Sequence, residues 1–260
     1  VEYDVPASVD GRTVAGATGF ARYLPMLPVQ DVANLVTMGE GDTPLISLPG
    51  AGVAIGVKHL YGKLEMCNPT GSFKDRGNAV QVSVLKETGV TRAADIAGGN
   101  AGHSFAAYCA RAGIKFVGFA YRGGYTIDGP DNRKVQAIVQ TGAEMHWVEG
   151  DRQACQEAMS RFCEDTGTLN MVYGRNAYFI EGNKTMAYEI ASQMDPLPDH
   201  IIVPVGNGST FQGLWLGFKE MLEDGRVQRM PRLHGVQTEA FQPLVHAFNR
   251  EDRKASTGAA

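Results

Sequence analysis

Residues 68–77, with the sequence NPTGSFKDRG, join a turn-forming tetrapeptide to a predicted helix start. Ser72 and Asp75 have the spacing of a capping box, which places Lys74 in the first helical turn. There the positive end of the helix dipole disfavours an ammonium ion and lowers the pKa of the lysine. A neutral amine is what Schiff-base chemistry requires. The alternative is a solvated surface lysine beside Asp75 and Arg76, because most lysines lie at the surface.

A second candidate loop covers residues 97–104 (AGGNAGHS), between a predicted strand and a predicted helix. In α/β sheets, ligands bind beyond the carboxyl ends of the strands. Backbone N–H groups at the helix start could hold a carboxylate, and Asn100 offers a donor and an acceptor to a ring oxygen. The alternative is a tight turn that needs glycine. The candidate substrate-binding positions beside Asn100 are Gly99, Ala101, Gly102 and His103.

A third loop, residues 203–210 (VPVGNGST), again leads from a predicted strand into a predicted helix. Exposed N–H groups, a favourable helix dipole and glycines without Cβ atoms make it a candidate phosphate site. No Gly-Lys-Ser/Thr follows, and the next glycine is Gly213, so neither nucleotide-binding fingerprint is present. The candidate phosphate-binding residues are Gly206, Asn207, Gly208, Ser209 and Thr210.

Taken together, the three loops provide an amine, a site for a carboxylate and a ring oxygen, and a phosphate site. These are the parts needed to hold pyridoxal phosphate and an amino acid.

The elements that must position these loops alternate along the chain. Helical patterns of about ten residues separate short apolar runs, and such connections cross over a face of the sheet. The pattern therefore predicts an α/β fold with parallel strands. The predicted strands are 95–98, 115–121, 144–148, 170–173, 201–205 and 233–237, and the predicted helices are 104–112, 132–141, 151–164, 181–194 and 211–222.

Composition narrows the class of ligand and the compartment. The 260 residues are 43% hydrophobic and 20% charged, enough for one large domain or two modest ones. A net charge of -4 argues against nucleic-acid binding. No apolar run has membrane-spanning length and no secretion signal is visible, so we expect a cytoplasmic protein that binds no membrane. The four cysteines lack zinc or disulfide spacing, so we expect no metal site.

The lysine loop resembles that of the pyridoxal-phosphate enzymes of fold type II, most of all the threonine synthases. Other segments that follow this family's order are residues 22–23, 39–45, 99–102, 106–108, 134–136, 142–143, 181–185 and 204–208. The resemblance implies that Lys74 forms the Schiff base, that Asn100 bonds the cofactor's phenolic oxygen, and that residues 206–210 bind its phosphate. It also implies two parallel-sheet, three-layer domains, the smaller (78–173) inserted into the larger (1–77 and 174–260).

The resemblance implies a lyase that acts on a small amino acid by elimination or replacement, with Lys74 as proton carrier. For threonine synthases proper, the reaction converts O-phosphohomoserine to threonine. Asn176 matches a substrate-binding position of the family. Residues 98–99, 173–174 and Phe179 differ from the family residues that contact the substrate phosphate.

Two alternatives therefore stay open. One is a β-replacing or deaminating relative, similar to cysteate synthase or to a serine/threonine dehydratase, which needs no site for a substrate phosphate. The other is a truncated, non-catalytic homologue that binds pyridoxal phosphate. The family continues past residue 237 and supplies there a Ser or Thr facing the pyridine nitrogen, so we expect a trimmed chain or a shortened paralogue. Relatives are often homodimers, and the resemblance implies the same here.

Overall fold

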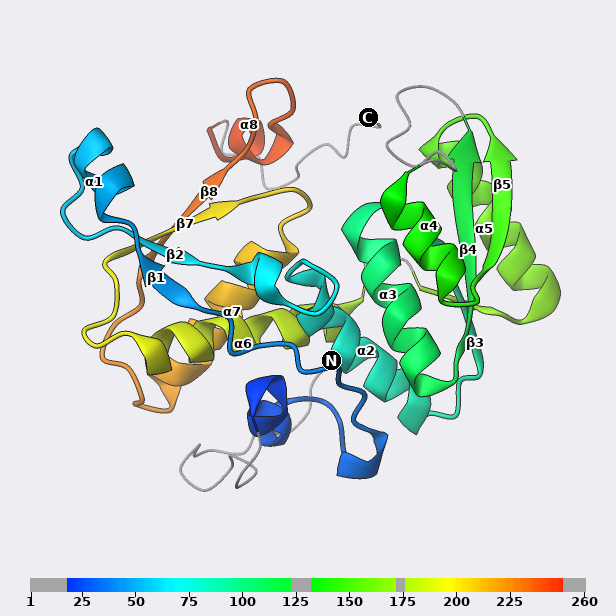
Figure 1. Ribbon diagram of the computed structural model, residues 1–260, viewed down its shortest axis with the longest axis horizontal. Coiled ribbons are helices and arrows are strands. Elements are labelled where there is room, and N and C mark those ends of the chain that lie inside the picture. Colours follow the sequence, from blue (N-terminus) through cyan, green and yellow to red (C-terminus); the bar gives the residue numbers. More distant parts are fainter. Residues whose placement is uncertain (1–17, 123–131, 172–175, 250–260) are drawn as a thin grey trace.

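Two groups of strands flank a central pair of long helices, α2 (Lys74–Glu87) and α6 (Ala177–Gln193) (Figure 1). The computed structural model describes residues 18–122, 132–171 and 176–249. Helices α2 and α6 pack so closely that a Cβ added to Gly182 would lie 2.0 Å from the carbonyl oxygen of Arg76. The start of α2, where the lysine loop ends, is therefore held against α6.

The larger group is a four-stranded parallel sheet in the order β5-β4-β3-β6. Its strands are β3 (Arg92–Ile96), β4 (Lys115–Arg122), β5 (Glu144–Glu149) and β6 (Leu169–Asn170). Alternate residues of β3 and β4 point to opposite faces of the sheet, so their side chains belong to two separate apolar clusters, one on each face. The helices of this region are α3 (Gly99–Ala112), α4 (Arg133–Gln140) and α5 (Arg152–Thr166).

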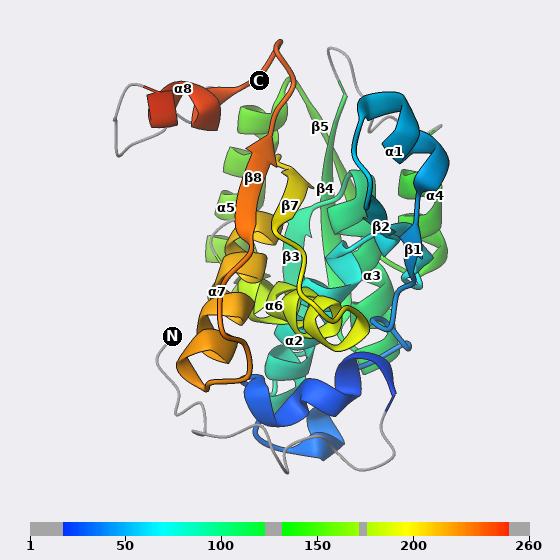
Figure 2. The same ribbon diagram turned by 90° about the vertical axis from the view of Figure 1, so that its left-hand side faces the viewer.

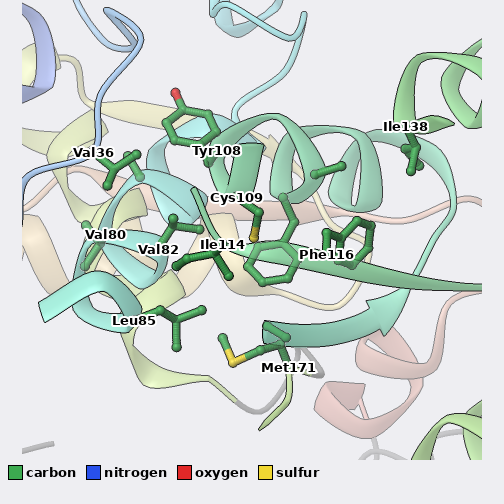
Figure 3. Packing of buried hydrophobic residues seen from close by; sticks show 14 of the residues in the cluster. Val36, Val80, Val82, Leu85, Tyr108, Cys109, Ile114, Phe116, Ile138 and Met171 are labelled. Carbon is green, nitrogen blue, oxygen red and sulfur yellow. The ribbon is translucent and has the colours of Figure 1, made fainter. Parts of the chain in front are cut away.

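One face of this sheet packs on α2 and α3, and the other packs on α5. Val82 and Leu85 of α2, Cys109 of α3 and Phe116 of β4 belong to the first cluster (Figure 3). Cys155 and Met159 of α5 belong to the second. The sheet therefore lies between α3 and α5 in three layers, and α2 packs on α3.

The second group holds two short sheets on the other side of α2 and α6 (Figures 1 and 2). Strands β7 (His200–Pro204) and β8 (Arg232–Val236) pair in parallel, and β1 (Leu45–Ser47) pairs with β2 (Tyr61–Lys63) antiparallel. Helix α7 (Ser209–Glu223) packs along α6 in an apolar cluster that includes Leu214 and Phe218. The remaining helices are α1 (Pro49–Ile55), α8 (Pro243–Asn249) and the 3-10 helices η1 (Gly19–Met26), η2 (Val32–Asn34) and η3 (Glu65–Cys67).

The predicted alternation of helices and parallel strands is confirmed, with boundaries that differ by a few residues. Helix α3 begins at Gly99 rather than at Ser104, so Asn100 lies in its first turn. The reciprocal capping box predicted for Ser72 and Asp75 is wrong: Phe73 is the residue that precedes α2, and the Ser72 hydroxyl accepts only a long hydrogen bond of 3.4 Å from the N–H of Lys74. The physical reason is that Asp75, its intended partner, is occupied elsewhere. The predicted strand 170–173 extends into residues outside the described ranges.

Across the parts of the chain that the structure describes, the helices are either too short or too polar to cross a bilayer.

Candidate active site

Lys74 is the first residue of α2, as the sequence predicts, and its side chain is largely buried. Its Nζ lies 4.5 Å from the centre of the Phe73 ring and 5.4 Å from that of Phe179 on α6. Burial between these rings lowers the pKa of Lys74 to about 8, because desolvation disfavours the ammonium form. A substantial fraction of this amine is therefore neutral near physiological pH, as a nucleophilic lysine requires.

Phe179 reaches Lys74 because residue 77 is a glycine. A Cβ on Gly77 would lie 2.4 Å from a ring carbon of Phe179, so the ring occupies the space that a side chain would fill. The phenyl ring is fully buried in the first turn of α6. An apolar wall thus stands beside the reactive amine.

The predicted phosphate loop forms the amino end of α7. Gly208 precedes the helix with a φ of 92°, a left-handed conformation that favours glycine. The Asn207 side chain accepts a hydrogen bond from the backbone N–H of Ser209 at 3.2 Å. The Ser209 hydroxyl is buried and has no hydrogen-bond partner, and the space around a Cβ on Gly206 is open. A buried, unsatisfied hydroxyl at a helix amino end suits an anionic ligand.

Lys74 and this loop face each other across one cavity of about 180 Å³. The cavity residues are Phe73, Lys74, Pro204, Val205, Gly206, Asn207, Gly208, Ser209, Thr210 and Phe211. The structure thus brings together the lysine and all five candidate phosphate-binding residues, which lie about 130 positions apart in the sequence. Their side chains come from the amino ends of two helices that both pack on α6.

The second loop lies apart from that cavity. Asn100 is exposed in the first turn of α3, and Gly99 adopts a φ of 53° with open space around it. Gly102 is buried, and a Cβ there would approach the Ala97 backbone at 3.0 Å, so packing explains this glycine. His103 is partly buried, and its Nδ1 lies 3.4 Å from Nζ of Lys134. Burial and the charge of Lys134 lower the pKa of His103.

Asn176 serves the protein's own backbone in this structure. Its side chain accepts a hydrogen bond from the N–H of Tyr178 as the cap of α6 and donates to Gln81 at 3.2 Å. Gln81 in turn donates to Asn78 at 2.6 Å, and Asn78 lies 3.5 Å from the carbonyl oxygen of Ala101. A line of amide side chains therefore runs from the partly buried Asn176 at the start of α6, through the buried Gln81 and Asn78, toward the first turn of α3.

Arg76, in the first turn of α2, joins this helix to Glu65 and to Glu189 of α6. Its guanidinium is fully buried and bonds to both oxygens of Glu65 and both oxygens of Glu189, at 2.7–2.8 Å. Burial alone would lower the pKa of Arg76, but the two carboxylates outweigh it and raise the pKa. Lys63 adds a second cation to Glu189 at 2.7 Å. The alternative of a solvated surface lysine at position 74 is wrong, because Lys74 is largely buried and its neighbours Asp75 and Arg76 are fully buried.

Asn78, Gln81 and Lys134 lie near the site without having been assigned a site role from the sequence, although residues 134–136 are among the segments that resemble the family. Lys74, Asn78 and Gln81 are spaced four and three residues apart, so they lie on one face of α2. Their spacing on one face of the helix that begins at Lys74 is the signal that could have shown them. The contact between Lys134 and the lysine loop could not be predicted from spacing, because only the folded chain brings these residues together.

Metal-binding geometry is absent from the described residues, where histidine, cysteine and carboxylate side chains form no cluster of three or more. The four cysteines are free thiols, three of them buried.

The fold and the paired lysine and anion sites define an α/β protein built to hold a phosphorylated carbonyl cofactor. In comparisons with known proteins, residues 36–259 match the family described as "Pyridoxal-phosphate dependent enzyme". The chain belongs to this family.

Curated relatives include threonine synthases. That of Methanocaldococcus jannaschii is 35% identical over 233 residues, covering 89% of this chain and 56% of its own length. That of Bacillus sp. strain ULM1 is 36% identical over 224 residues, covering 86% of this chain and 61% of its own length. This chain thus spans little more than half the length of these relatives.

Solved structures with the same fold include maize serine racemase, with a TM-score of 0.70 at 20% identity, covering 84% of this chain and 62% of the other. Threonine deaminase isoform 2 from Solanum lycopersicum has a TM-score of 0.68 at 19% identity, covering 81% and 55%. At these identities the likeness shows the fold, and it confirms the predicted fold type II architecture.

The residues present fit pyridoxal phosphate. Ser209 provides an unsatisfied buried hydroxyl, α7 provides unpaired backbone N–H groups, and Lys74 provides an amine of lowered pKa across the same cavity. Open space at Gly206 leaves room for a ligand to approach the backbone.

Proposed function

We propose that this chain is a pyridoxal-phosphate-dependent lyase that acts on a small amino acid by elimination or replacement. The observation that carries the proposal is the single cavity shared by Lys74 and the amino end of α7. When bound, the cofactor supplies an electron sink for bonds at the α-carbon of the amino acid.

The chain's own residues then have separate tasks. Gly206, Asn207, Gly208, Ser209 and Thr210 hold the phosphate through backbone N–H groups and hydroxyls. Lys74 holds the cofactor covalently and carries a proton at Nζ, which its pKa near 8 allows in both directions at neutral pH.

The first turn of α3 has the remaining binding tasks in this proposal. Asn100 donates to the phenolic oxygen of the cofactor. The N–H groups of the turn bind the substrate carboxylate, together with His103. The positions assigned to the substrate are Gly99, Ala101, Gly102, His103 and Asn176.

The conversion of O-phosphohomoserine to threonine is one form of this proposal, supported by relatives named threonine synthase. Deamination or β-replacement of an unphosphorylated amino acid is the second form. The observation that favours it is the sequence itself, because residues 98–99, 173–174 and Phe179 differ from the family residues that contact the substrate phosphate. A phosphate dianion without such partners is costly to bury. A homodimer, a cytoplasmic location and a smaller domain at 78–173 are further proposals.

The first test reduces the chain with borohydride after addition of pyridoxal phosphate and maps the adduct by mass spectrometry. We expect the adduct on the Lys74 peptide, none in Lys74→Ala, and an unchanged yield in Lys58→Ala, which alters an exposed lysine. An adduct elsewhere, or none in the wild type, would refute the proposal.

A second test separates the two forms of the reaction. It measures phosphate release from O-phosphohomoserine beside keto-acid formation from serine and threonine. Phosphate release with threonine as product supports the first form, and keto-acid formation without it supports the second.

A further inference from the structure

The carboxylate of Asp75 links the lysine turn to the first turn of α3. Its Oδ1 accepts hydrogen bonds from the hydroxyls of Thr70 and Ser104, each at 2.5 Å, and its Oδ2 accepts from the backbone N–H of Thr70 at 2.7 Å. The side chains of Asp75 and Ser104 are fully buried. One carboxylate thus holds two segments that lie 29 residues apart in the chain.

The two ends of this link lie next to the residues of the proposed site. Lys74 immediately precedes Asp75 in the first turn of α2. Asn100 lies four residues before Ser104, so the two occupy one face of α3 a single turn apart. The link therefore spans the gap between the reactive amine and the turn that carries Asn100.

Apolar packing alone would not set this geometry. Apart from the Asp75–Ser104 bond and a long contact of 3.5 Å between the Asn78 amide and the carbonyl oxygen of Ala101, helices α2 and α3 meet through residues such as Val82 and Cys109 in a shared hydrophobic cluster. Hydrophobic contacts are non-directional and tolerate small shifts, whereas a short hydrogen bond to a carboxylate fixes both distance and angle. The hydroxyls of Thr70 and Ser104 and the N–H of Thr70 all donate to the oxygens of the Asp75 carboxylate.

A second contact supports the same turn from outside. Nζ of Lys134 donates to the carbonyl oxygen of Thr70 at 3.1 Å and lies 3.4 Å from Nδ1 of His103. Lys134 belongs to α4, so a third element joins the lysine turn to α3. The lysine turn and the first turn of α3 are thus joined twice, by the Asp75 carboxylate and by the Lys134 ammonium group.

We propose that Asp75 is a positioning residue that sets the first turn of α3, with Asn100, at a fixed distance and orientation from Lys74. The ligands assigned to that turn rest on the proposed function. The Asp75–Ser104 bond itself does not.

The test compares two serine-to-alanine variants. Ser104→Ala removes the bond between the helices and leaves Asp75 bonded to Thr70. Ser83→Ala is the matched control, since Ser83 is equally buried on α2 but bonds to Ala79 and to the N–H of Val36. Both changes remove one buried hydroxyl, so the losses of global stability should be similar.

The first readout is amide hydrogen exchange of the chain without cofactor. The amides of residues 103–106 bond to the carbonyls of the first turn of α3 and report its order. We expect their exchange to become about fivefold to tenfold faster in Ser104→Ala, as the loss of one hydrogen bond predicts, and to be unchanged in Ser83→Ala. Equal exchange in the two variants would overturn the inference.

The second readout is a spectral titration of the cofactor-loaded chain with serine as the probe. We expect the dissociation constant for serine to rise about fivefold to tenfold in Ser104→Ala alone, while the adduct at Lys74 forms to the same extent. Faster exchange with unchanged serine affinity would refute the positioning role. If the wild type takes up neither cofactor nor serine, the proposed function fails, and the exchange data alone decide whether the link orders α3.

Discussion

Replacing Glu189 with glutamine should be among the most destabilising isosteric changes in the chain. The buried carboxylate accepts four hydrogen bonds, two from Arg76, one from Lys63 at 2.7 Å and one from the N–H of Asp42 at 2.9 Å. A glutamine side chain has one acceptor oxygen, and its NH₂ group would face a cation. The substitution therefore leaves buried positive charge without its partner.

The expected loss in free energy of unfolding is about 3 kcal/mol. Removing one partner of a buried ion pair costs about 3–5 kcal/mol, and the value falls at the lower end because Arg76 keeps both bonds to Glu65. Since total stability is about 5–15 kcal/mol, the loss is easily measured. The assay is urea titration of both proteins at pH 7. We expect a lower midpoint for Glu189→Gln and the same slope of unfolding free energy against urea concentration.

The matched control is Glu223→Gln, which alters an exposed pair with Lys219 on α7. That change should cost less than about 0.5 kcal/mol, because exposed pairs are screened by water. A loss below about 1 kcal/mol for Glu189→Gln, or equal losses for the two variants, would refute the reasoning.

The effect of Glu189 should also depend on pH. Burial alone would raise the pKa of Glu189, but the hydrogen bonds and charges of Arg76 and Lys63 outweigh it and lower the pKa. An acid with a lowered folded-state pKa contributes stability above its unfolded pKa and loses it as the pH falls through the folded value. The difference between wild type and Glu189→Gln should therefore shrink below about pH 4.

Three further outcomes can be tested. In urea titrations, Asp95→Asn should stabilise the chain by on the order of a few kcal/mol at pH 8 and by little at pH 4. The reason is that burial raises the pKa of Asp95 to about 8, so that the ionised carboxylate costs folding free energy at high pH. Equal effects at both pH values would contradict this. Gly182→Ala should lower the melting temperature sharply, since its Cβ would meet the Arg76 backbone, whereas Gly50→Ala, with open space, should not. The rate of cofactor capture should rise with pH with a midpoint near 8, set by Lys74; a midpoint above 10 would mean that burial does not lower this pKa.

Much of the architecture follows from local sequence alone. Glycine-punctuated apolar runs and helical patterns correctly predict the parallel strands from β3 to β8 and the helices between them. Asn132 and Asp151 lie at predicted helix starts and cap α4 and α5 in the structure. Strands β1 and β2 were missed, because three-residue strands leave no measurable period.

The positions of Lys74 and of the α7 loop at helix starts could also be predicted from local sequence, because turn-forming residues and glycines precede both helices. What the sequence could not determine is that the two loops share one cavity. That depends on how α2 and α7 pack on α6, through close contacts at Gly182, Gly213 and Gly217. A glycine in the sequence indicates that another segment could pack closely against it, but only the tertiary structure shows which segment does.

Charge burial was likewise decided by tertiary structure. Asp75 and Arg76 stand beside Lys74 in a segment that composition would assign to the surface. Both can be buried because distant parts of the chain provide their partners: Ser104 of α3 bonds to Asp75, and Glu189 of α6 pairs with Arg76. A buried charge is stable only with such partners. The sequence by itself therefore determined which chemical groups stand at the start of each helix, and the tertiary structure decided which of them meet.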